Sequence, residues 1–414
     1  MRNAESPGRA FAESTARIRR STCVHRFAAS VALPLILAAR VACADIPPAE
    51  RQTLLELYDS TNGPGWLNHT GWGDPPGTEC TWWGIQCDGA QAHVIVIDLR
   101  SDNLDGSLVS IVALTNLQEF AVGGNPIGGT IPSLAGMTNL QIFSLYGAQI
   151  GGSIPPLTGL TSLQIFEVSN NLLTGPIPSL EGLDNLNSFG ASNNLLTGAL
   201  PSLAGLASLQ QFYVDHNQLS GPIPPLDNVP NLFSMVLNHN QLTGTIPSLD
   251  AVPDIEGFDA TANQLTGEIP SLSNLTLLQD FDVAENHLTG SIPPLGTLTN
   301  LVTFYVNGNQ LSGSIPSLAG LTQLVEFDVA SNALTGSIPS LADLTSLVRI
   351  VVDHNQLSGD VPDVPNPDDL RSGESGLCPN SLAPTPNAAW DDATGVTPWY
   401  LDCDRLFADG FDAT

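Results

Sequence analysis

Lysine does not occur in this chain of 414 residues, and all 12 of its cationic residues are arginine. Seven of them lie in the first 44 residues, and none occurs between residues 101 and 348. The formal net charge is −29. Because phosphate binding needs Lys or Arg, this composition excludes nucleic acid and anionic lipid as partners. It favours a basic partner or a cation; the alternative is that the charge only keeps a long protein soluble.

Long apolar runs are absent after the first 44 residues, so no later segment reaches the ~20 residues that a spanning helix needs. The basic start is followed by an apolar stretch at 27–39 (FAASVALPLILAA) and by Ala42-Cys43-Ala44. This layout predicts a secretory signal peptide over residues 1–44. The mature chain is then secreted or extracytoplasmic, with the cell surface or the periplasm as options. Lipidation at Cys43 is disfavoured, because Arg40 stands where a lipobox has an aliphatic residue.

Cysteine is also scarce, and only Cys80, Cys87, Cys378 and Cys403 follow the leader. Four cysteines allow three disulfide connectivities. The long interval between the two pairs favours Cys80–Cys87 and Cys378–Cys403. A zinc site is the alternative, but no histidine stands at suitable spacing near either pair.

The centre of the chain repeats itself every 23 residues. Ten of the twelve residues in one series are Asn, and the exceptions are Asp102 and Ala148. Gly follows four residues after every member of the series, and Pro follows seven residues after eleven of them. A fixed period of this length predicts a solenoid of stacked coils. We call the series the ladder residues, and number the coils one to twelve from Asp102 to Asn355.

One coil shows how the repeat folds. Phe166-Glu167-Val168 alternates between apolar and polar residues, as a strand with one buried face does. The amide of Asn171 both donates and accepts, so it can satisfy the backbone of the bend that follows. Gly175 supplies a backbone conformation that a Cβ would oppose, and Ile177-Pro178 continues as an extended return. Stacked coils then form one parallel sheet on the concave side and irregular segments or 3-10 turns on the convex side.

A stacked aromatic spine should fill the core, because one inward position of the strand is nearly always Phe. Met235 and Ile350 complete the series. We interpret this column as core and not as a ligand cavity, since it alternates inward with its neighbours. Its phenylalanines are Phe120, Phe143, Phe166, Phe189, Phe212, Phe258, Phe281, Phe304 and Phe327.

The pattern LxxLxLxxNxLTGxIPxL, seen as LQIFEVSNNLLTGPIPSL at 163–180, resembles the plant-type leucine-rich repeat. Receptor-kinase ectodomains and polygalacturonase-inhibiting proteins carry repeats of this type. CTWWGIQCD at 80–88 is similar to the disulfide box of that family's N-terminal cap. The resemblance covers residues 46–365 and implies ligand binding on the concave face. The period of 23 is one residue shorter than usual, and the lysine-free composition resembles that of a high-GC bacterium.

The chain divides into four parts. A signal peptide at 1–44 precedes an N-terminal cap at 45–93, the solenoid occupies 94–365, and a C-terminal cap with an acidic tail occupies 366–414. All six tryptophans lie outside the repeats, which predicts hydrophobic caps over the open ends of the stack. The Pro- and Asp-rich stretch from Asp363 predicts that part of the tail lacks fixed structure.

No catalytic constellation is recognisable: there is no phosphate loop, no HExxH, no nucleophile elbow and no cysteine with a plausible base. We therefore predict a binding protein without enzymatic activity, cofactor or metal, whose ligand is an extracellular protein or polysaccharide with basic groups. The candidate ligand-binding residues lie on the concave face, and each could also be idle polar surface. They are Tyr146, Tyr213, Asp215, His216, His239, Asp259, Asp282, Glu285, Tyr305 and Asp328.

These candidates form three groups. The tyrosines are expected to be exposed aromatic residues of the kind that dominate interfaces. Asp215, His216 and His239 form a polar cluster. Asp259 and Asp282 occupy the same position in adjacent coils, near Asp280, and no cation of the repeats is expected to relieve their repulsion. A basic partner is favoured over Ca²⁺, because a Ca²⁺ site needs six or more oxygens at fixed distance.

The alternative function is a surface-structural or ice-active solenoid. The residue before the repeat Gly is Thr or Ser in nine of twelve coils, and such a row could order water. Thr174, Thr197, Thr243 and Thr266 are examples. Thr-Gly is also a common dipeptide of the family that the repeats resemble, so this reading is disfavoured.

Overall fold

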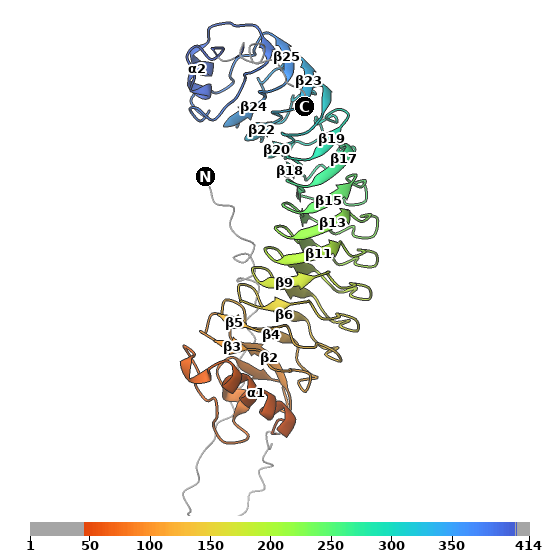
Figure 1. Cartoon of the computed structure of the whole chain (residues 1–414), viewed down its shortest axis with the longest axis vertical. Coiled ribbons are helices and arrows are strands. Elements are labelled where there is room, and N and C mark those ends of the chain that lie inside the picture. The colour runs from red at the N-terminus through yellow and green to blue at the C-terminus, as the bar shows by residue number, and fades with distance from the viewer. Residues whose placement is uncertain (1–44, 402, 404–414) are drawn as a thin grey trace, which may run out of the picture.

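The computed structural model describes residues 45–401 and 403, and within them the chain is a curved solenoid with a cap at each end (Figure 1). The predicted stack of coils with a parallel sheet on the concave side is confirmed. The predicted signal peptide, and the end of the tail from residue 404, lie outside the described residues.

A sheet of thirteen short strands lines the concave side. Its first pair is antiparallel, and every later pair is parallel and in register. The strands are β1 (Ile85–Cys87), β2 (Val94–Asp98), β4 (Glu119–Ala121), β6 (Ile142–Ser144), β8 (Ile165–Glu167), β10 (Ser188–Gly190), β12 (Gln211–Tyr213), β14 (Ser234–Val236), β16 (Gly257–Asp259), β18 (Asp280–Asp282), β20 (Thr303–Tyr305), β22 (Glu326–Asp328) and β24 (Arg349–Val351).

The aromatic spine is present in the core. Its phenylalanines are at most 1% exposed, and successive rings stack with centroids 5.4–5.9 Å apart. Met235 interrupts the ring contacts between Phe212 and Phe258. The spine decides which side chains reach the concave surface, because its neighbours in each strand point the opposite way.

Each ladder Asn joins two coils. Asn171 donates from Nδ2 to the Val168 carbonyl of its own coil at 3.0 Å and to the Leu145 carbonyl of the preceding coil at 2.9 Å. Its Oδ1 accepts the Ile150 N–H of the preceding coil at 3.0 Å. Asn194 to Asn355 repeat this pattern. The ladder therefore stabilises the stacking of coils as well as the bend predicted from the sequence.

A second set of parallel strands follows the ladder residues, which the prediction of an irregular return did not include. Seven strands form one sheet, four form another, and two pair at the N-terminal end. They are β7 (Gly151–Gly152), β9 (Leu172–Gly175), β11 (Leu195–Ala199), β13 (Gln218–Pro222), β15 (Gln241–Gly244), β17 (Gln264–Glu268) and β19 (His287–Thr289); then β21 (Ser312–Ser314), β23 (Ala333–Gly336), β25 (Gln356–Gly359) and β26 (Ser381–Leu382); and β3 (Gly106–Ser107) with β5 (Ile127–Gly128).

On the outer side, a coil makes two consecutive backbone turns, and each turn is closed by an N–H to carbonyl hydrogen bond. Leu183 N–H donates to the Leu180 carbonyl, and Leu186 N–H to the Leu183 carbonyl, at 3.2 and 2.8 Å. Two 3-10 helices of the described residues, η2 (Gly63–Gly65) and η3 (Glu79–Thr81), lie in the N-terminal cap. Asn185 and Asn231 each donate to a carbonyl of the preceding coil here, at 2.8 and 2.7 Å.

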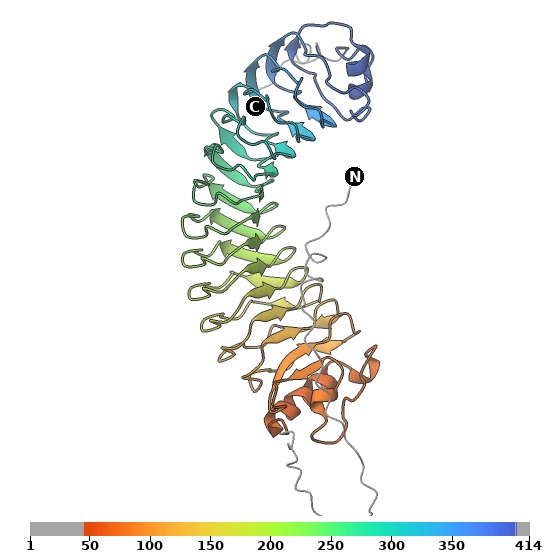
Figure 2. The ribbon, with the colours of Figure 1, turned by 180° about the vertical axis from the view of Figure 1, so that it is seen from behind.

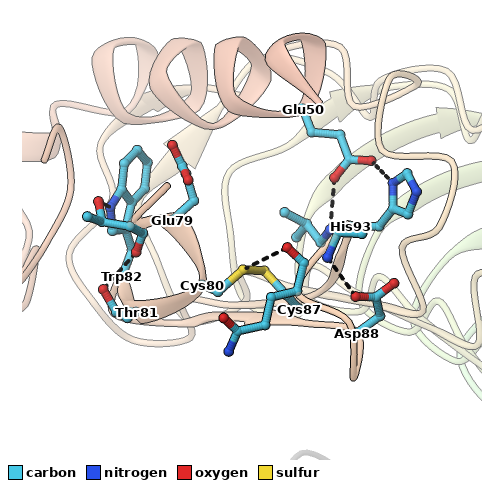
Figure 3. The surroundings of a disulfide bond; sticks show 12 residues. Glu50, Glu79, Cys80, Thr81, Trp82, Cys87, Asp88 and His93 are labelled. Carbon is cyan, nitrogen blue, oxygen red and sulfur yellow. Dashed lines mark hydrogen bonds and ion pairs between the residues drawn. A yellow bond between two sulfur atoms is a disulfide. The ribbon is translucent and has the colours of Figure 1, made fainter. Parts of the chain in front are cut away.

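The N-terminal cap is built from helix α1 (Pro48–Ser60) and the loop that carries η2 and η3. Glu50 of α1 is buried; its carboxylate accepts the Val94 N–H at 2.8 Å and contacts His93 Nδ1 at 2.7 Å, which fastens the helix to β2 (Figure 3). The Cys80–Cys87 disulfide joins η3 to β1 in the same view. Trp66, Trp72 and Trp82 pack beside it in the core.

The C-terminal cap begins as an irregular thirteenth coil. Asn380 acts as a further ladder residue, because its Oδ1 accepts the Leu357 N–H at 2.9 Å and its Nδ2 donates to the Val352 carbonyl at 2.8 Å. Helix α2 (Ala388–Thr394) and the Cys378–Cys403 disulfide complete it. The Pro- and Asp-rich stretch has a defined conformation as far as residue 401, and residues 402 and 404–414 lie outside the described residues. Figure 2 shows the caps at opposite ends of the stack.

Candidate ligand-binding face

Two columns of side chains project from the concave sheet. We call the residue after the spine residue in each coil the post-spine column, and the residue before it the pre-spine column. In β18, for example, Asp282 and Asp280 lie on either side of buried Phe281. Because the strands pair in register, residues of one column are neighbours in successive coils.

The post-spine column carries an acidic ladder, which consists of Asp259, Asp282, Tyr305 and Asp328 in coils eight to eleven. Asp259 pairs with Asp282, and Asp282 with Tyr305. Asp259 accepts the Thr261 N–H and Asp282 accepts the Ala284 N–H, each at 3.0 Å. Asn238 Nδ2 also donates to Asp259. The adjacent carboxylates therefore keep hydrogen bonds, but no Arg or His of the described residues forms an ion pair with either.

Asp282 has a strongly shifted pKa. The pKa of Asp282 is raised to about 6, mainly by burial and also by the negative charges of Asp259 and Asp328, while the hydrogen bond from the Ala284 N–H opposes the shift. Ionising the Asp282 carboxyl in the folded chain therefore costs more free energy than ionising it in water.

The far end of the acidic ladder, unlike Asp259 and Asp282, lies beside arginines that neutralise it. Arg349 of coil twelve donates to Asp328 at 2.9 Å, and Arg371 of the C-terminal cap donates to Glu326 at 3.2 Å. Tyr305 Oη donates to Glu326 at 2.6 Å. Asp328 is only 6% exposed, so it is better described as part of this internal network than as an open contact residue.

The tyrosines are less accessible than predicted. Tyr213 is 9% exposed, and Tyr146 and Tyr305 are half-buried. Burial raises the pKa of Tyr213, and hydrogen bonding to Ser234 and Gln211 opposes this shift. The expectation of three exposed aromatic residues is therefore wrong for Tyr213.

The predicted histidine cluster does form at the surface. The rings of His216 and His239 lie with centroids 4.4 Å apart, and His216 Nδ1 lies 2.9 Å from Asp215 Oδ2. Both histidines are exposed, as is Glu285 at the corresponding position of coil nine. Residues 45–401 and 403 contain no group of three or more His, Cys, Asp or Glu side chains placed to hold a metal ion.

The sequence analysis missed a second carboxylate site in coils four to six. Glu167 of the post-spine column is 6% exposed and lies against Gly190 of the next coil. Its Oε1 accepts the Ser169 N–H at 2.8 Å, and burial raises its pKa, with Asp215 adding to the shift. Glu167 shares its column with Asp259 and Asp282, so an alignment of the coils by column would have found it.

The hydroxyl row of the alternative function lies on the second set of strands. Several of its members donate to the preceding coil instead of facing only solvent. Thr174 and Thr266 donate to glycine carbonyls at 3.2 Å, and Thr335 does so at 3.3 Å. No helix of the described residues is long and apolar enough to span a bilayer.

Comparison with known proteins identifies the fold. No family model and no curated protein matches the chain. Among solved structures it resembles the plant peptide hormone receptor RGFR1 in complex with RGF2, at 30% identity over 74% of this chain and 55% of that one, with a TM-score of 0.63. The PEPR1–AtPEP1 structure matches at 25% identity over 81% of this chain and 56% of that one, with a TM-score of 0.62.

A plant ice-binding protein matches at 24% identity over 73% of this chain and 94% of that chain, with a TM-score of 0.51, which shows a shared fold alone. The chain has the leucine-rich-repeat fold. It spans little more than half the length of the two receptor structures, at 55% and 56%.

Proposed function

We propose that this chain is an exported leucine-rich-repeat protein that binds a peptide or protein segment with basic groups along its concave face. The proposal extends to this chain the peptide binding of RGFR1, a plant peptide hormone receptor in complex with RGF2. The predicted leader and the disulfides at both ends support an extracytoplasmic location.

The distribution of charge on the concave side carries the proposal. Glu167, Asp215, Asp259, Asp280, Asp282 and Glu285 lie in coils four to nine, where the sequence has no Lys or Arg. The four arginines of the described residues lie at the ends of the solenoid and already form ion pairs with carboxylates. A row of acids without Lys or Arg beside it attracts a basic partner and speeds its association.

Selection of a random peptide library on the purified chain tests this function. We expect enriched peptides to carry Lys or Arg, and their affinity to fall as salt rises. The double variant Asp259→Asn with Asp282→Asn should bind them about tenfold more weakly. The matched control is Asp184→Asn with Asp227→Asn, which removes two exposed carboxylates from the outer turns.

Two results contradict the proposal. One is the absence of any enriched peptide. The other is equal loss of binding in the concave and control variants, which would mean that only the overall charge matters. A glycan array measured in parallel decides whether a polysaccharide with amino groups is the better ligand.

The ice-active alternative is tested by ice recrystallisation with the same protein. The hydroxyl row is regular, but its members at Thr174, Thr266, Ser312 and Thr335 donate to backbone carbonyls, which limits their bonds to ordered water. We expect no inhibition of recrystallisation.

A further inference from the structure

Coil five carries only small residues on the concave face. The three concave side chains of this coil are the small residues Ser188, Gly190 and Ser192, and all three are buried. Coil four contributes Glu167 on one side, and coil six contributes Tyr213 and Asp215 on the other. We call this group of six residues the coil-five notch.

Glu167 occupies the space that Gly190 leaves open. A Cβ on Gly190 would overlap the Oε2 atom of Glu167, so only glycine permits this position of the carboxylate. The Ser169 N–H donates to Oε1 at 2.8 Å. No arginine or histidine of the described residues forms an ion pair with Glu167. A carboxylate that is 6% exposed and lacks a counter-ion is costly, because burial removes its hydration.

Ser188 supplies an independent observation. It precedes Gly190 by two residues in β10, so both positions face the concave side. Its side chain is 2% exposed, and its Oγ has no hydrogen-bond partner among the described residues. Burying a hydroxyl without a partner costs free energy, and most folded proteins avoid it. An unpartnered hydroxyl and a carboxylate without a counter-ion therefore lie on the concave side of adjacent coils, in neighbouring columns of the sheet.

Asp215 lies on the side of the coil-five notch opposite Glu167, and two neighbouring side chains fix the orientation of its carboxylate. Ser192 Oγ donates to its Oδ1, and His216 Nδ1 lies 2.9 Å from its Oδ2. The notch thus presents two carboxylates and a hydroxyl beside the ring of Tyr213. A cationic N–H group satisfies this set, because an ammonium has three donors and a guanidinium has five, and neither has an acceptor.

We propose that the coil-five notch is the subsite for a cationic side chain of the ligand, with Glu167 as its counter-ion and Ser188 and Asp215 as further acceptors. The inference rests on the proposed function and names the group that the concave face recognises. Lysine and arginine share the required chemistry, and binding at the notch moves Glu167 from its contact with Gly190 toward the ligand.

The test is a double-mutant cycle between the chain and a peptide selected from the random library. Each Lys or Arg of that peptide is replaced in turn by uncharged norleucine. We expect one replacement to weaken binding to the parent chain at least about tenfold and to leave binding to Glu167→Gln nearly unchanged. Exchanging Lys and Arg at that position shows which cation fits. Glu181→Gln, an exposed carboxylate of an outer turn, is the matched control and should behave as the parent.

A second variant, Ser188→Ala, keeps the subsite testable if Glu167→Gln does not fold. Ser188→Ala should weaken the cationic peptide about threefold and leave the norleucine version unchanged, as expected for one lost hydrogen bond. If peptides bind but none of their cations is coupled to Glu167, the subsite is disproved while the proposed function stands. If no peptide binds the parent chain, the proposed function fails, and the subsite fails with it.

Discussion

The residue before each ladder position has a left-handed backbone in all twelve coils, with φ between 50° and 69°. Gly fills this position only in coils two, three and ten; elsewhere it is Ser, Asn, His, Ala or Glu. The repeat Gly four residues after the ladder position is also left-handed in every coil, as the sequence predicted. Each coil thus reverses direction through two left-handed residues, of which only the second is always glycine.

Ala262 is the least suitable of these residues, because alanine has no side-chain group to compensate the strain of a positive φ. We expect Ala262→Asn to raise the free energy of unfolding by roughly 0.5–1 kcal/mol, since Asn tolerates this conformation. Denaturant melts measure the change. Asn193→Ala, at the equivalent position of coil five, is the control and should lose a similar amount; a gain there would show that strain does not govern this position.

Ala148 interrupts the ladder in coil three, and the structure shows a partial substitute. The Ile127 N–H, which a ladder Asn would accept, donates to the Asn125 carbonyl at 2.8 Å. We expect Ala148→Asn to add about 1 kcal/mol, the net value of a hydrogen bond. Asn171→Ala should cost about 2–3 kcal/mol, because it leaves buried groups unpaired. Equal stability of Ala148→Asn and the parent would mean that the Asn125 carbonyl already compensates in full.

At the scale of elements, β16, β18, β20 and β22 place one polar column beside a fully apolar one. Phe258, Phe281, Phe304 and Phe327 face the core, and the acidic ladder faces the concave side. Register follows from the constant period, because a slip by one residue would bury the acids and expose the rings. The same regularity forces Asp259 and Asp282 to be neighbours.

The raised pKa of Asp282 makes stability depend on pH in a defined window. Between the ordinary value of 3.8 and about 6, the folded chain holds a proton that the unfolded chain has released. The free energy of unfolding should therefore fall as pH rises through this window, by at most about 3 kcal/mol from this group. Asp282→Asn removes the effect and keeps an acceptor for the Ala284 N–H.

Thermal melts of parent and Asp282→Asn across this window measure the difference. We expect the variant to be more stable near pH ~7.5 and equal to the parent near pH ~4. Asp227→Asn, an exposed outer-turn control, should show no such trend. Parallel curves for the parent and Asp282→Asn would show that this carboxyl titrates normally.

At the scale of the whole molecule, stability depends on covering the hydrophobic core that is open at both ends of the stack. Each coil contacts only its neighbours, so the stack frays from its termini unless a cap covers them. Helix α1 and three buried tryptophans cover one end, and Trp390 and Trp399 cover the other. A disulfide lies in each cap.

Replacing Cys80 and Cys87 together by Ser should lower the free energy of unfolding by about 2–3 kcal/mol, the loop-closure entropy of a short disulfide. Hydrogen exchange should then accelerate first in coils one and two. The matched variant, with Cys378 and Cys403 replaced by Ser, should accelerate exchange in coils eleven and twelve. Uniform acceleration along the stack in either variant would contradict local fraying.

The repeat period alone determined the solenoid, the buried spine and the side of the sheet on which each residue lies. These properties depend on the spacing of apolar and polar residues along the chain, and this spacing is the same in every coil. The opposition of Asp259 and Asp282 followed in the same way, because residues one period apart become neighbours in a stack. The fold of one coil therefore predicts the fold of the other coils.

Tertiary structure decided which of these residues are accessible and which are paired. Tyr213 lies in an outward-facing column yet is only 9% exposed, and Ser234 and Gln211 lie near it. Arg349 forms an ion pair with Asp328 of the preceding coil, and the carboxylate of Glu167 lies against Gly190 of the next coil. Column position assigns a side chain to a face, but burial and pairing depend on the size and charge of its neighbours in the coils before and after it. Those neighbours are 23 residues away in the chain and become adjacent only when the coils stack.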